Sequence, residues 1–310
     1  MYPSPAARPA YAESTTRGGE AFWDDYWTTL SLPREVRKGT SAMVDFITGV
    51  FDEYLPPGEG RTAIELGGAP GQYAAYLNRV LGYEPYVLDR SRVGCEKTRE
   101  NFRLLGIPGT VFQGDLFDTP TSPSRFDVVY SLGLIEHFDD LTEGIRAHVR
   151  LAKPNGIVVV GAPNFAGIYR PLFKRLAPRA LTTVNPMTMD ISTWSEFEDQ
   201  LGLEPLFRDY IGGFEPRQLS VIESTRLRDR ALLGALHRLR HVTESRAGRR
   251  LRRWNAPAWS AYLLGVYRVP STSGAACGGR AAAPPARGSR QALSGRATTG
   301  ARWAGRSPGA

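Results

Sequence analysis

The sequence is poor in cysteine and has no long apolar run. Its 310 residues include two cysteines, Cys95 and Cys277, which are too few for a disulfide framework or a zinc site. No stretch approaches the roughly 18 apolar residues that a membrane-spanning helix requires, and the first residues lack the basic start and apolar core of a secretory signal. We therefore expect a cytoplasmic protein with no transmembrane segment and no bound metal ion.

The basic residues are concentrated in two segments. Residues 226–253 hold ten arginines and two acids, and residues 271–310 hold six arginines and no acid. Subtracting their charges of +8 and +6 from the total of +8 leaves −6 for the rest of the chain. The sequence therefore argues against a uniformly basic, nucleic-acid-binding surface, and the two basic segments need explanations of their own.

The middle of the chain alternates short apolar runs with helical patterns. Apolar strands joined by helices are typical of a parallel sheet that is covered on both faces. This pattern predicts a doubly wound α/β core over roughly residues 60–163. We expect strands at 62–66, 84–88, 110–113, 126–131 and 156–162, helices at 72–82, 91–105 and 141–151, and closing strands at 205–211 and 259–269.

Composition divides the chain further. The N-terminal segment is rich in Pro, Ala, Ser, Thr and Gly, and the C-terminal one in Gly, Ala, Arg and Ser, so neither can bury enough apolar surface to fold. The predicted parts are a disordered N-terminus (1–20), N-terminal helices or a helical lid (21–59), an α/β domain (60–270) and a disordered tail (271–310). Two insertions in the α/β domain (165–203 and 212–258) are expected to form the pocket for a second molecule, the acceptor in the reaction.

A glycine-rich loop follows the first predicted strand. Gly67, Gly68, Ala69, Pro70 and Gly71 are small or turn-forming residues that let a ligand approach the backbone, and the next helix offers free N–H groups at its start. The spacing does not fit the dinucleotide pattern G-x-G-x-x-G, and no Gly-Lys-Ser/Thr ends the loop as in a P-loop. An acid ahead of the loop, in place of a lysine, suits the cationic, phosphate-free sulfonium of S-adenosylmethionine.

Acidic residues lie at the ends of three successive predicted strands. Glu65 precedes the loop, Asp89 ends the second strand and Asp115 follows the third. An acid at the position of Asp89 can accept hydrogen bonds from both ribose hydroxyls, and Asp115 can accept one from an adenine amino group. Each acid alone could equally cap a helix. Their shared position at the strand ends, where open α/β sheets bind ligands, favours a nucleoside-like ligand.

The order of these motifs resembles that of class I S-adenosylmethionine-dependent methyltransferases. The matching motifs are 65–71, Asp89, 114–116, 126–138 and 153–156, and they lie within residues 40–165. The resemblance implies a Rossmann-like, seven-stranded, mostly parallel sheet with helices on both faces, helical additions and an antiparallel last strand.

The same resemblance implies S-adenosylmethionine as cofactor and assigns its contacts. Glu65 and the glycine loop would face the methionine part, Asp89 would hold the ribose, and Asp115 and Leu116 would frame the adenine. Ser131 to Gly133 would line the cofactor and the mouth of the substrate site. The cofactor-binding residues are thus expected to be Glu65, Gly67, Gly68, Ala69, Gly71, Asp89, Arg90, Asp115, Leu116, Ser131 and Leu132.

The segment after the fourth predicted strand bears on the methyl acceptor. It lacks the Asn/Asp-Pro-Pro-Tyr/Phe motif of enzymes that methylate planar amines, and Leu132 stands where ribose 2′-O-methyltransferases place a catalytic aspartate. Residues 134–138 instead resemble the Glu-His turn of a small-molecule branch that includes quinone-biosynthesis O-methyltransferases. We expect O-methylation of a small molecule, with His137 as general base. His137 could also merely cap a helix or pack beside the cofactor.

Two further features leave alternatives open. The aromatic cluster Trp23, Tyr26 and Trp27 resembles a helical lid over the cofactor, or a helix packed on the sheet edge. The pattern of residues 226–253 predicts a basic helix. This helix either contacts anionic lipid or nucleic acid weakly, or packs on the protein as an ordinary helix with a solvated basic face. An RNA or protein methyltransferase that uses this segment, a non-catalytic S-adenosylmethionine-binding protein and a dehydrogenase stay as alternatives, and the oligomeric state is not predicted.

Overall fold

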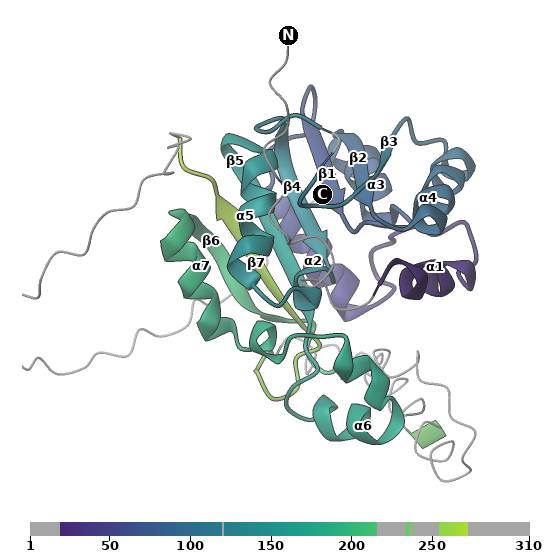
Figure 1. Cartoon of the computed structure of the whole chain (residues 1–310), viewed down its shortest axis with the longest axis vertical. Helices are drawn as coiled ribbons and strands as arrows, with labels where there is room; N and C mark the ends of the chain where they lie inside the picture. The colour runs from purple at the N-terminus through teal and green to yellow at the C-terminus, as the bar shows by residue number, and fades with distance from the viewer. Residues whose placement is uncertain (1–18, 120, 216–233, 236–237, 239–253, 272–310) are drawn as a thin grey trace, which may run out of the picture. The chain divides into compact units, whose positions relative to one another are not determined.

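One sheet of seven strands organises the part of the chain that the structure describes, residues 19–119, 121–215, 234–235, 238 and 254–271 (Figure 1). The structure is a computed structural model. The strand order is β3-β2-β1-β4-β5-β7-β6, with parallel pairs from β3 to β5 and with β7 antiparallel to both of its neighbours. The strands are β1 Thr62–Leu66, β2 Glu84–Asp89, β3 Thr110–Gln113, β4 Phe126–Leu132, β5 Ala152–Pro163, β6 Glu204–Ile211 and β7 Tyr262–Arg268.

Helices cover both faces of this sheet (Figure 1). In β5, Val158 and Val160 pack with α5 and α7, whereas Val159 points to the opposite face with α2, as the two-residue period of a strand requires. All three valines are fully buried, which is why this strand reads as a continuous apolar run. The α-helices are α1 Glu20–Thr28, α2 Ala42–Tyr54, α3 Gln72–Tyr76, α4 Arg92–Leu105, α5 Leu141–Leu151, α6 Tyr169–Leu176 and α7 Trp194–Leu201.

Short helical turns connect the larger elements. A π-helical turn continues α3, and the other four turns are 3₁₀ helices. Three of these follow α6 within the segment that sequence reasoning assigned to the acceptor side. The turns are η1 Leu77–Leu81, η2 Ile135–His137, η3 Pro178–Thr182, η4 Pro186–Met189 and η5 Ile191–Thr193.

The predicted fold class is confirmed, with differences at element boundaries. The strand predicted to begin at 156 begins at Ala152, because the Lys153–Gly156 stretch, with Asn155 at φ 59°, forms an irregularity inside β5 where its register with β4 shifts. The predicted strand 259–269 is shorter, since β7 covers Tyr262–Arg268. The predicted helix 72–82 divides into α3 and η1 and ends at Gly82 in the left-handed conformation.

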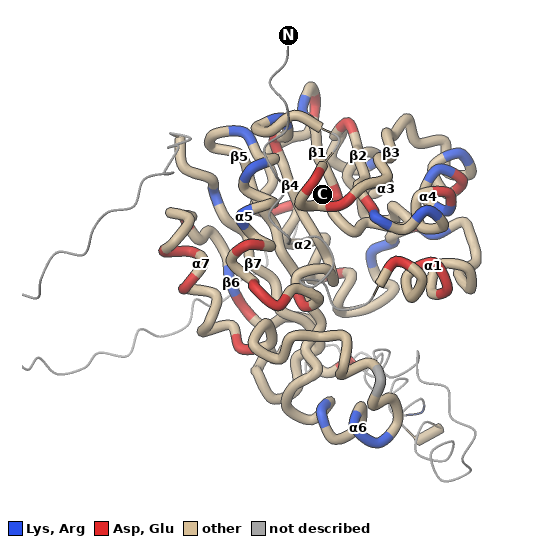
Figure 2. The backbone as a smooth tube through the Cα atoms, in the orientation of Figure 1, with Lys and Arg blue, Asp and Glu red and all other residues tan. Residues whose placement is uncertain are grey.

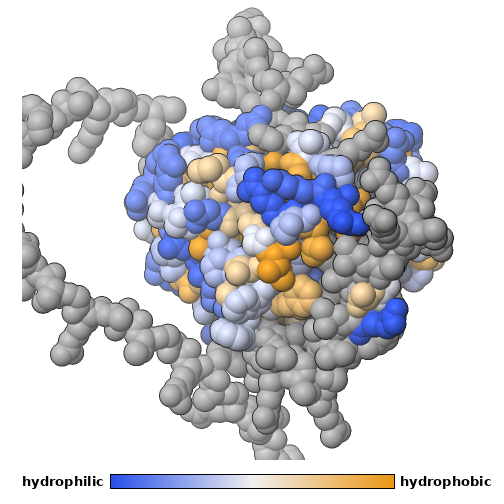
Figure 3. Space-filling view, turned by 90° about the horizontal axis from the view of Figure 1, so that it is seen from below, coloured by the Kyte–Doolittle hydropathy of each residue, from blue (hydrophilic) through white to orange (hydrophobic). Residues whose placement is uncertain are grey.

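Charged residues of both signs are spread over the described elements. Figure 2 shows acidic residues on α1 and α7 and basic residues on α6. Seen from below, the surface exposes hydrophobic side chains beside strongly hydrophilic ones (Figure 3). Within the described ranges, no helix is long and apolar enough to cross a membrane. The predicted basic helix 226–253 lies outside the described residues except for Gly234, Ala235 and Arg238, as do residues 1–18 and 272–310.

Helix packing requires one glycine of the loop, Gly71. Gly71 precedes α3 with φ 77°, in the left-handed region that favours glycine. A Cβ atom at this position would lie 2.7 Å from the ring of Phe102 and 2.9 Å from the methyl group of Thr98, both on α4. Gly71 therefore allows α3 and α4 to approach each other closely.

Replacement of Gly71 by alanine should destabilise the fold more than the same change at Gly106. Gly106 also has a positive φ, of 66°, but a Cβ atom there would meet nothing within 4 Å. We expect Gly106→Ala to lower the free energy of unfolding by about 1 kcal/mol, and Gly71→Ala by roughly 2–4 kcal/mol because steric overlap adds to backbone strain. Urea denaturation of both variants measures the difference. Equal losses of unfolding free energy in the two variants would show that α4 moves to accommodate the methyl group at position 71.

Candidate functional site

A cavity of about 570 Å³ lies at the carboxyl ends of the central parallel strands. Leu66, Asp89 and Leu132, which end β1, β2 and β4, all line it, as expected for a ligand site in an open α/β sheet. Helix α1 and the turns η2 and η3 contribute further walls. The predicted residues that line the cavity are Glu65, Gly67, Gly68, Ala69, Asp89, Arg90, Asp115, Leu116, Leu132 and His137.

Glu65 lies beneath the glycine loop. Its Oε2 accepts hydrogen bonds from the N–H of Ala74 and the hydroxyl of Tyr130, each at 3.2 Å. A Cβ atom on Gly68 would lie 2.5 Å from Cγ of Glu65, so the loop passes over this side chain without room for another. Burial raises the pKa of Glu65 to about 8, against which the two hydrogen bonds act only in part. Glu65 thus places a carboxyl group at the floor of the cavity, and its Oε2 accepts both of these hydrogen bonds.

Asp89 joins the glycine loop to the start of α4. Its Oδ2 accepts the N–H of Ala69 at 3.2 Å, and its Oδ1 accepts the N–H of Ser91 at 2.9 Å. Burial raises the pKa of Asp89 to about 6. Each carboxylate oxygen has a second lone pair, so Asp89 can accept two further hydrogen bonds from a ligand.

Two predicted residues do not line the cavity. Gly71 packs against α4, as described above. The Ser131 hydroxyl lies 2.9 Å from Nε2 of His148, whose Nδ1 lies 2.8 Å from the Gly144 carbonyl. Because that carbonyl can only accept, Nδ1 carries the hydrogen and the serine donates to Nε2. The alternation of β4 directs Ser131 to the face covered by α5, so only Leu132 reaches the cavity.

His137 lies in the η2 turn with a defined hydrogen-bonding pattern. Its Nδ1 is 2.7 Å from the backbone oxygen of Thr183, an atom that can only accept, so Nδ1 carries the hydrogen. Burial lowers the pKa of His137, which favours the neutral ring. In that ring Nε2 has a free lone pair, and this atom lies 3.7 Å from Oε1 of Glu136. His137 therefore offers a proton acceptor at the cavity wall.

Glu136 is a site residue to which sequence reasoning assigned no role. Its side chain is 3% exposed and lines the cavity. Among the described residues, its Oε2 has no hydrogen-bond partner. Burial raises the pKa of Glu136 to about 8. The sequence showed only a Glu-His pair, and burial of the glutamate follows from elements that are distant in the chain.

Asn185 holds the η2 turn in place. Its N–H donates to the backbone oxygen of Glu136 at 2.6 Å, and its side-chain amide donates to the backbone oxygens of Phe138 (3.0 Å) and Asp139 (3.1 Å). The local signal, an asparagine before Pro186, predicts a cap for η4, a role that Asn185 also performs. No local signal predicts its contacts across about 47 residues of chain.

Helix α1 contributes four aromatic side chains to the cavity wall: Phe22, Trp23, Tyr26 and Trp27. The Trp23 ring lies 4.9 Å from the ring of His137, centre to centre, in an edge-to-face arrangement. The carboxylate of Asp24 accepts hydrogen bonds from the Ser91 hydroxyl and, at 3.3 Å, the Val93 N–H, which ties α1 to the start of α4. Nε1 of Trp27 is buried without a hydrogen-bond partner among the described residues.

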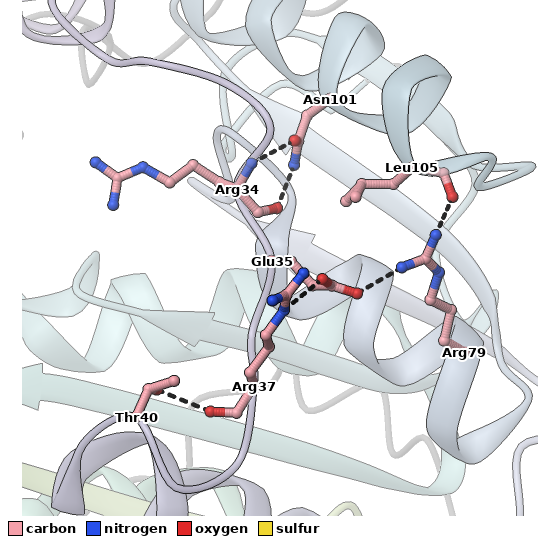
Figure 4. Close-up of polar contacts among 7 residues, drawn as sticks. All are labelled: Arg34, Glu35, Arg37, Thr40, Arg79, Asn101 and Leu105. Atoms are coloured by element: carbon pink, nitrogen blue, oxygen red, sulfur yellow. Dashed lines mark hydrogen bonds and ion pairs between the residues drawn. The ribbon is translucent and has the colours of Figure 1, made fainter.

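Arg34 is a second residue that sequence reasoning missed. The side chain of Asn101 accepts from its N–H (2.8 Å) and donates to its backbone oxygen (2.9 Å) and to that of Pro70 (2.9 Å). Figure 4 shows the Arg34 guanidinium pointing away from Asn101 and from the ion pairs that Glu35 makes. The side chain lines the cavity and forms no hydrogen bond or ion pair with the described part of the chain. Arg34 thus places a cation beside the glycine loop.

The donor set of the described residues does not suit a metal ion, since no three of their His, Cys, Asp and Glu side chains converge in a way that could hold one. The site therefore consists of small loop residues, carboxyl groups, a neutral histidine and aromatic rings. This combination can bind a nucleoside-like cation and remove a proton from a second molecule beside it.

Replacement of Glu136 by glutamine should stabilise the protein at alkaline pH. The pKa of this carboxyl is about 8 in the fold against 4.5 ordinarily, so its contribution to stability is complete below pH 4.5 and is lost as the pH rises through 8. We expect the free energy of unfolding of Glu136→Gln, relative to wild type, to rise by up to about 4 kcal/mol between about pH 5 and pH 8.5.

Urea denaturation at both pH values measures this effect. Glu59→Gln, at an exposed position, controls for the loss of one acid. If Glu136→Gln and wild type show the same pH dependence, Glu136 ionises in the fold as it does in the unfolded chain.

The chain is similar in sequence and in fold to known methyltransferases. Residues 64–160 match the family described as methyltransferase domain. A protein-L-isoaspartate O-methyltransferase of Nitrobacter winogradskyi is 25% identical over 56% of this chain and 74% of its own length. A ubiquinone biosynthesis O-methyltransferase of Proteus mirabilis is 29% identical, but the chain spans only 43% of that relative. A putative sarcosine dimethylglycine methyltransferase from Galdieria sulphuraria has the same fold, with a TM-score of 0.51, 15% identity and coverage of 81% of this chain and 98% of its own.

Proposed function

Because the chain is a class I S-adenosylmethionine-dependent methyltransferase, we propose that it methylates a hydroxyl group of a small-molecule acceptor. The observation that carries this proposal is the His137 ring, whose Nδ1 hydrogen is fixed by Thr183 while Nε2 keeps a free lone pair at the cavity wall. A hydroxyl acceptor needs a base in this position, because its proton must leave as the new bond forms.

The cavity residues fit the cofactor. Gly67 and Gly68 have no room for side chains, because added Cβ atoms would lie 2.9 Å from Leu134 and 2.5 Å from Glu65, so the loop presents bare backbone. Asp89 has lone pairs for two ribose hydroxyls, and the buried Trp27 N–H is a donor without a partner among the described residues. We assign the Arg34 guanidinium to the cofactor carboxylate, to which it is complementary in charge. Arg90, Asp115 and Leu116 also line the cavity, and we propose that they contact the cofactor, Asp115 and Leu116 at its adenine.

S-adenosylmethionine, when bound, would supply an electrophilic methyl group for the acceptor oxygen. The chain's own residues position the acceptor and accept its proton at Nε2 of His137. The aromatic rings of α1 stand at the cavity wall, and we propose that they act as a lid that excludes water. The alternative in which residues 226–253 hold RNA or protein depends on residues outside those described.

Replacement of His137 by glutamine should lower turnover and leave cofactor affinity unchanged. Glutamine keeps polarity but cannot act as a base, so we expect a loss of about 10²–10⁴ in kcat/KM. Since burial lowers the pKa of His137, wild-type activity should persist below pH 6.5 and fall only at more acidic pH. Calorimetric titration with S-adenosylmethionine and release of S-adenosylhomocysteine give the two measurements. Near-normal turnover of the variant would remove His137 from the reaction.

Replacement of Asp89 by alanine should weaken cofactor binding. Loss of the carboxylate removes the proposed acceptors for both ribose hydroxyls, and hydrogen bonds to a charged group each contribute about 1.5–3 kcal/mol. We therefore expect the Kd for S-adenosylmethionine to rise at least about tenfold. Asp199→Ala, at an exposed position of α7, is the control and should bind as wild type does. An unchanged Kd in a folded Asp89→Ala protein would refute the ribose assignment.

A further inference from the structure

Glu136 is a buried acid that neither the fold nor the proposed proton transfer uses. Its side chain is 3% exposed, and Oε2 has no hydrogen-bond partner in the described part of the chain. Buried polar groups in folded proteins are almost always hydrogen-bonded, and those left without a partner call for a specific explanation. An apolar residue would pack here without that penalty, so packing alone does not account for a glutamate.

The backbone of the turn that carries Glu136 is held in place by hydrogen bonds. Asn185 holds the backbone oxygen of Glu136 and, through Phe138 and Asp139, the end of the same turn. Gly133, at φ 91°, leaves space beside Oε1, from which an added Cβ atom would be 3.5 Å away. The turn therefore holds the Glu136 side chain at the cavity wall, with Oε2 lacking a hydrogen-bond partner among the described residues.

Glu136 and His137 form a pair of neighbouring hydrogen-bond acceptors. Nε2 of His137 lies 3.7 Å from Oε1 of Glu136, and both side chains line the cavity. Because Nδ1 of His137 donates to Thr183, its cavity-facing nitrogen can only accept in the neutral ring. The neutral Glu136 carboxyl group has one oxygen that donates and one that accepts, so a molecule with two adjacent donors can place one on Nε2 of His137 and the other on the accepting oxygen.

We propose that Glu136 binds a second hydrogen-bond donor of the methyl acceptor, on the carbon next to the hydroxyl that His137 deprotonates. This inference rests on the proposed O-methylation and narrows its substrate class to hydroxyl compounds with an adjacent hydroxyl or amino group. One donor gives its proton to Nε2 of His137 as its oxygen is methylated, and the other donates to the Glu136 carboxyl group and keeps its proton.

The surroundings indicate the body of such a molecule. Phe138, Phe165 and Val184 line the cavity with the pair, and Trp23 contacts the His137 ring. These side chains suit a flat apolar framework with polar groups at one edge. A compound with a single donor would leave the Glu136 carboxyl group unsatisfied, and sites built to bond a substrate hydroxyl reject analogues that lack it.

Four aromatic compounds test the proposal: catechol, 2-aminophenol, phenol and 2-methoxyphenol. The last has the bulk of an adjacent substituent but no second donor, so it separates hydrogen bonding from size. Methyl transfer is followed by release of S-adenosylhomocysteine, and the products are identified by mass spectrometry. We expect the wild-type protein to favour catechol and 2-aminophenol over both single-donor compounds by about tenfold or more in kcat/KM.

Two variants assign the preference to Glu136. Glu136→Met removes the carboxyl group at similar volume and should reduce the preference to within about threefold, with the Kd for S-adenosylmethionine unchanged. Glu136→Gln keeps one acceptor oxygen and should retain part of the preference. A residue with only a structural role would change the rates for all four compounds equally.

Each negative result has a separate meaning. Equal wild-type rates for catechol and 2-methoxyphenol, or an unchanged preference in a folded Glu136→Met protein, would overturn the role of Glu136 and leave O-methylation standing. If none of the four compounds is methylated, the substrate class is wrong. In that case, methylation of amines or carboxylates by the same preparation would also refute the proposed O-methylation, whereas methylation of other hydroxyl compounds would preserve it.

Discussion

The cavity depends on one constraint, the parallel direction of β1, β2, β3 and β4. Parallel strands end at the same edge of a sheet, so the loops after them meet there although they are far apart in the sequence. Asp89 adds a direct link at this edge, because its carboxylate binds the loop after β1 and the turn that begins α4. The glycine loop, Asp89 and Asp115 take their positions from this arrangement, and the antiparallel β7 extends the sheet on the far side.

The sequence predicted a place at the cavity most readily for residues at or just after the end of a strand. Glu65, Asp89 and Asp115 line the cavity, as expected, because the end of an apolar run predicts which edge of the sheet these residues reach. Ser131 was assigned to the cofactor, but its place on the strand faces α5, and a shift of register between β4 and β5 makes that face hard to read. Arg34 lies in an irregular segment with no pattern of its own, so its position depends on a long-range contact to Asn101. The burial of Glu136 likewise depends on Asn185, in a segment that matches no motif.

Two carboxyl groups of the proposed cofactor site, those of Glu65 and Asp89, have pKa values that burial raises. Burying ionisable groups in one cavity opposes folding, and natural proteins tolerate such groups mainly where function requires them. A cationic ligand offsets this opposition, because it favours the ionised form of each group. The same carboxyl groups that weaken the empty fold at alkaline pH therefore strengthen the attraction for a sulfonium.

The contact between His137 and Thr183 also has a consequence for how the enzyme can diverge in evolution. Thr183 and Val184 line the cavity, and the backbone oxygen of Thr183 accepts the hydrogen bond from Nδ1 of His137. An insertion or deletion that reshaped this wall for a new substrate would also shift the oxygen that sets the tautomer. Point substitutions of side chains leave that oxygen in place. Changes in the length of this segment would therefore alter the cavity wall and the tautomer of His137 together, whereas side-chain replacements would alter the wall alone.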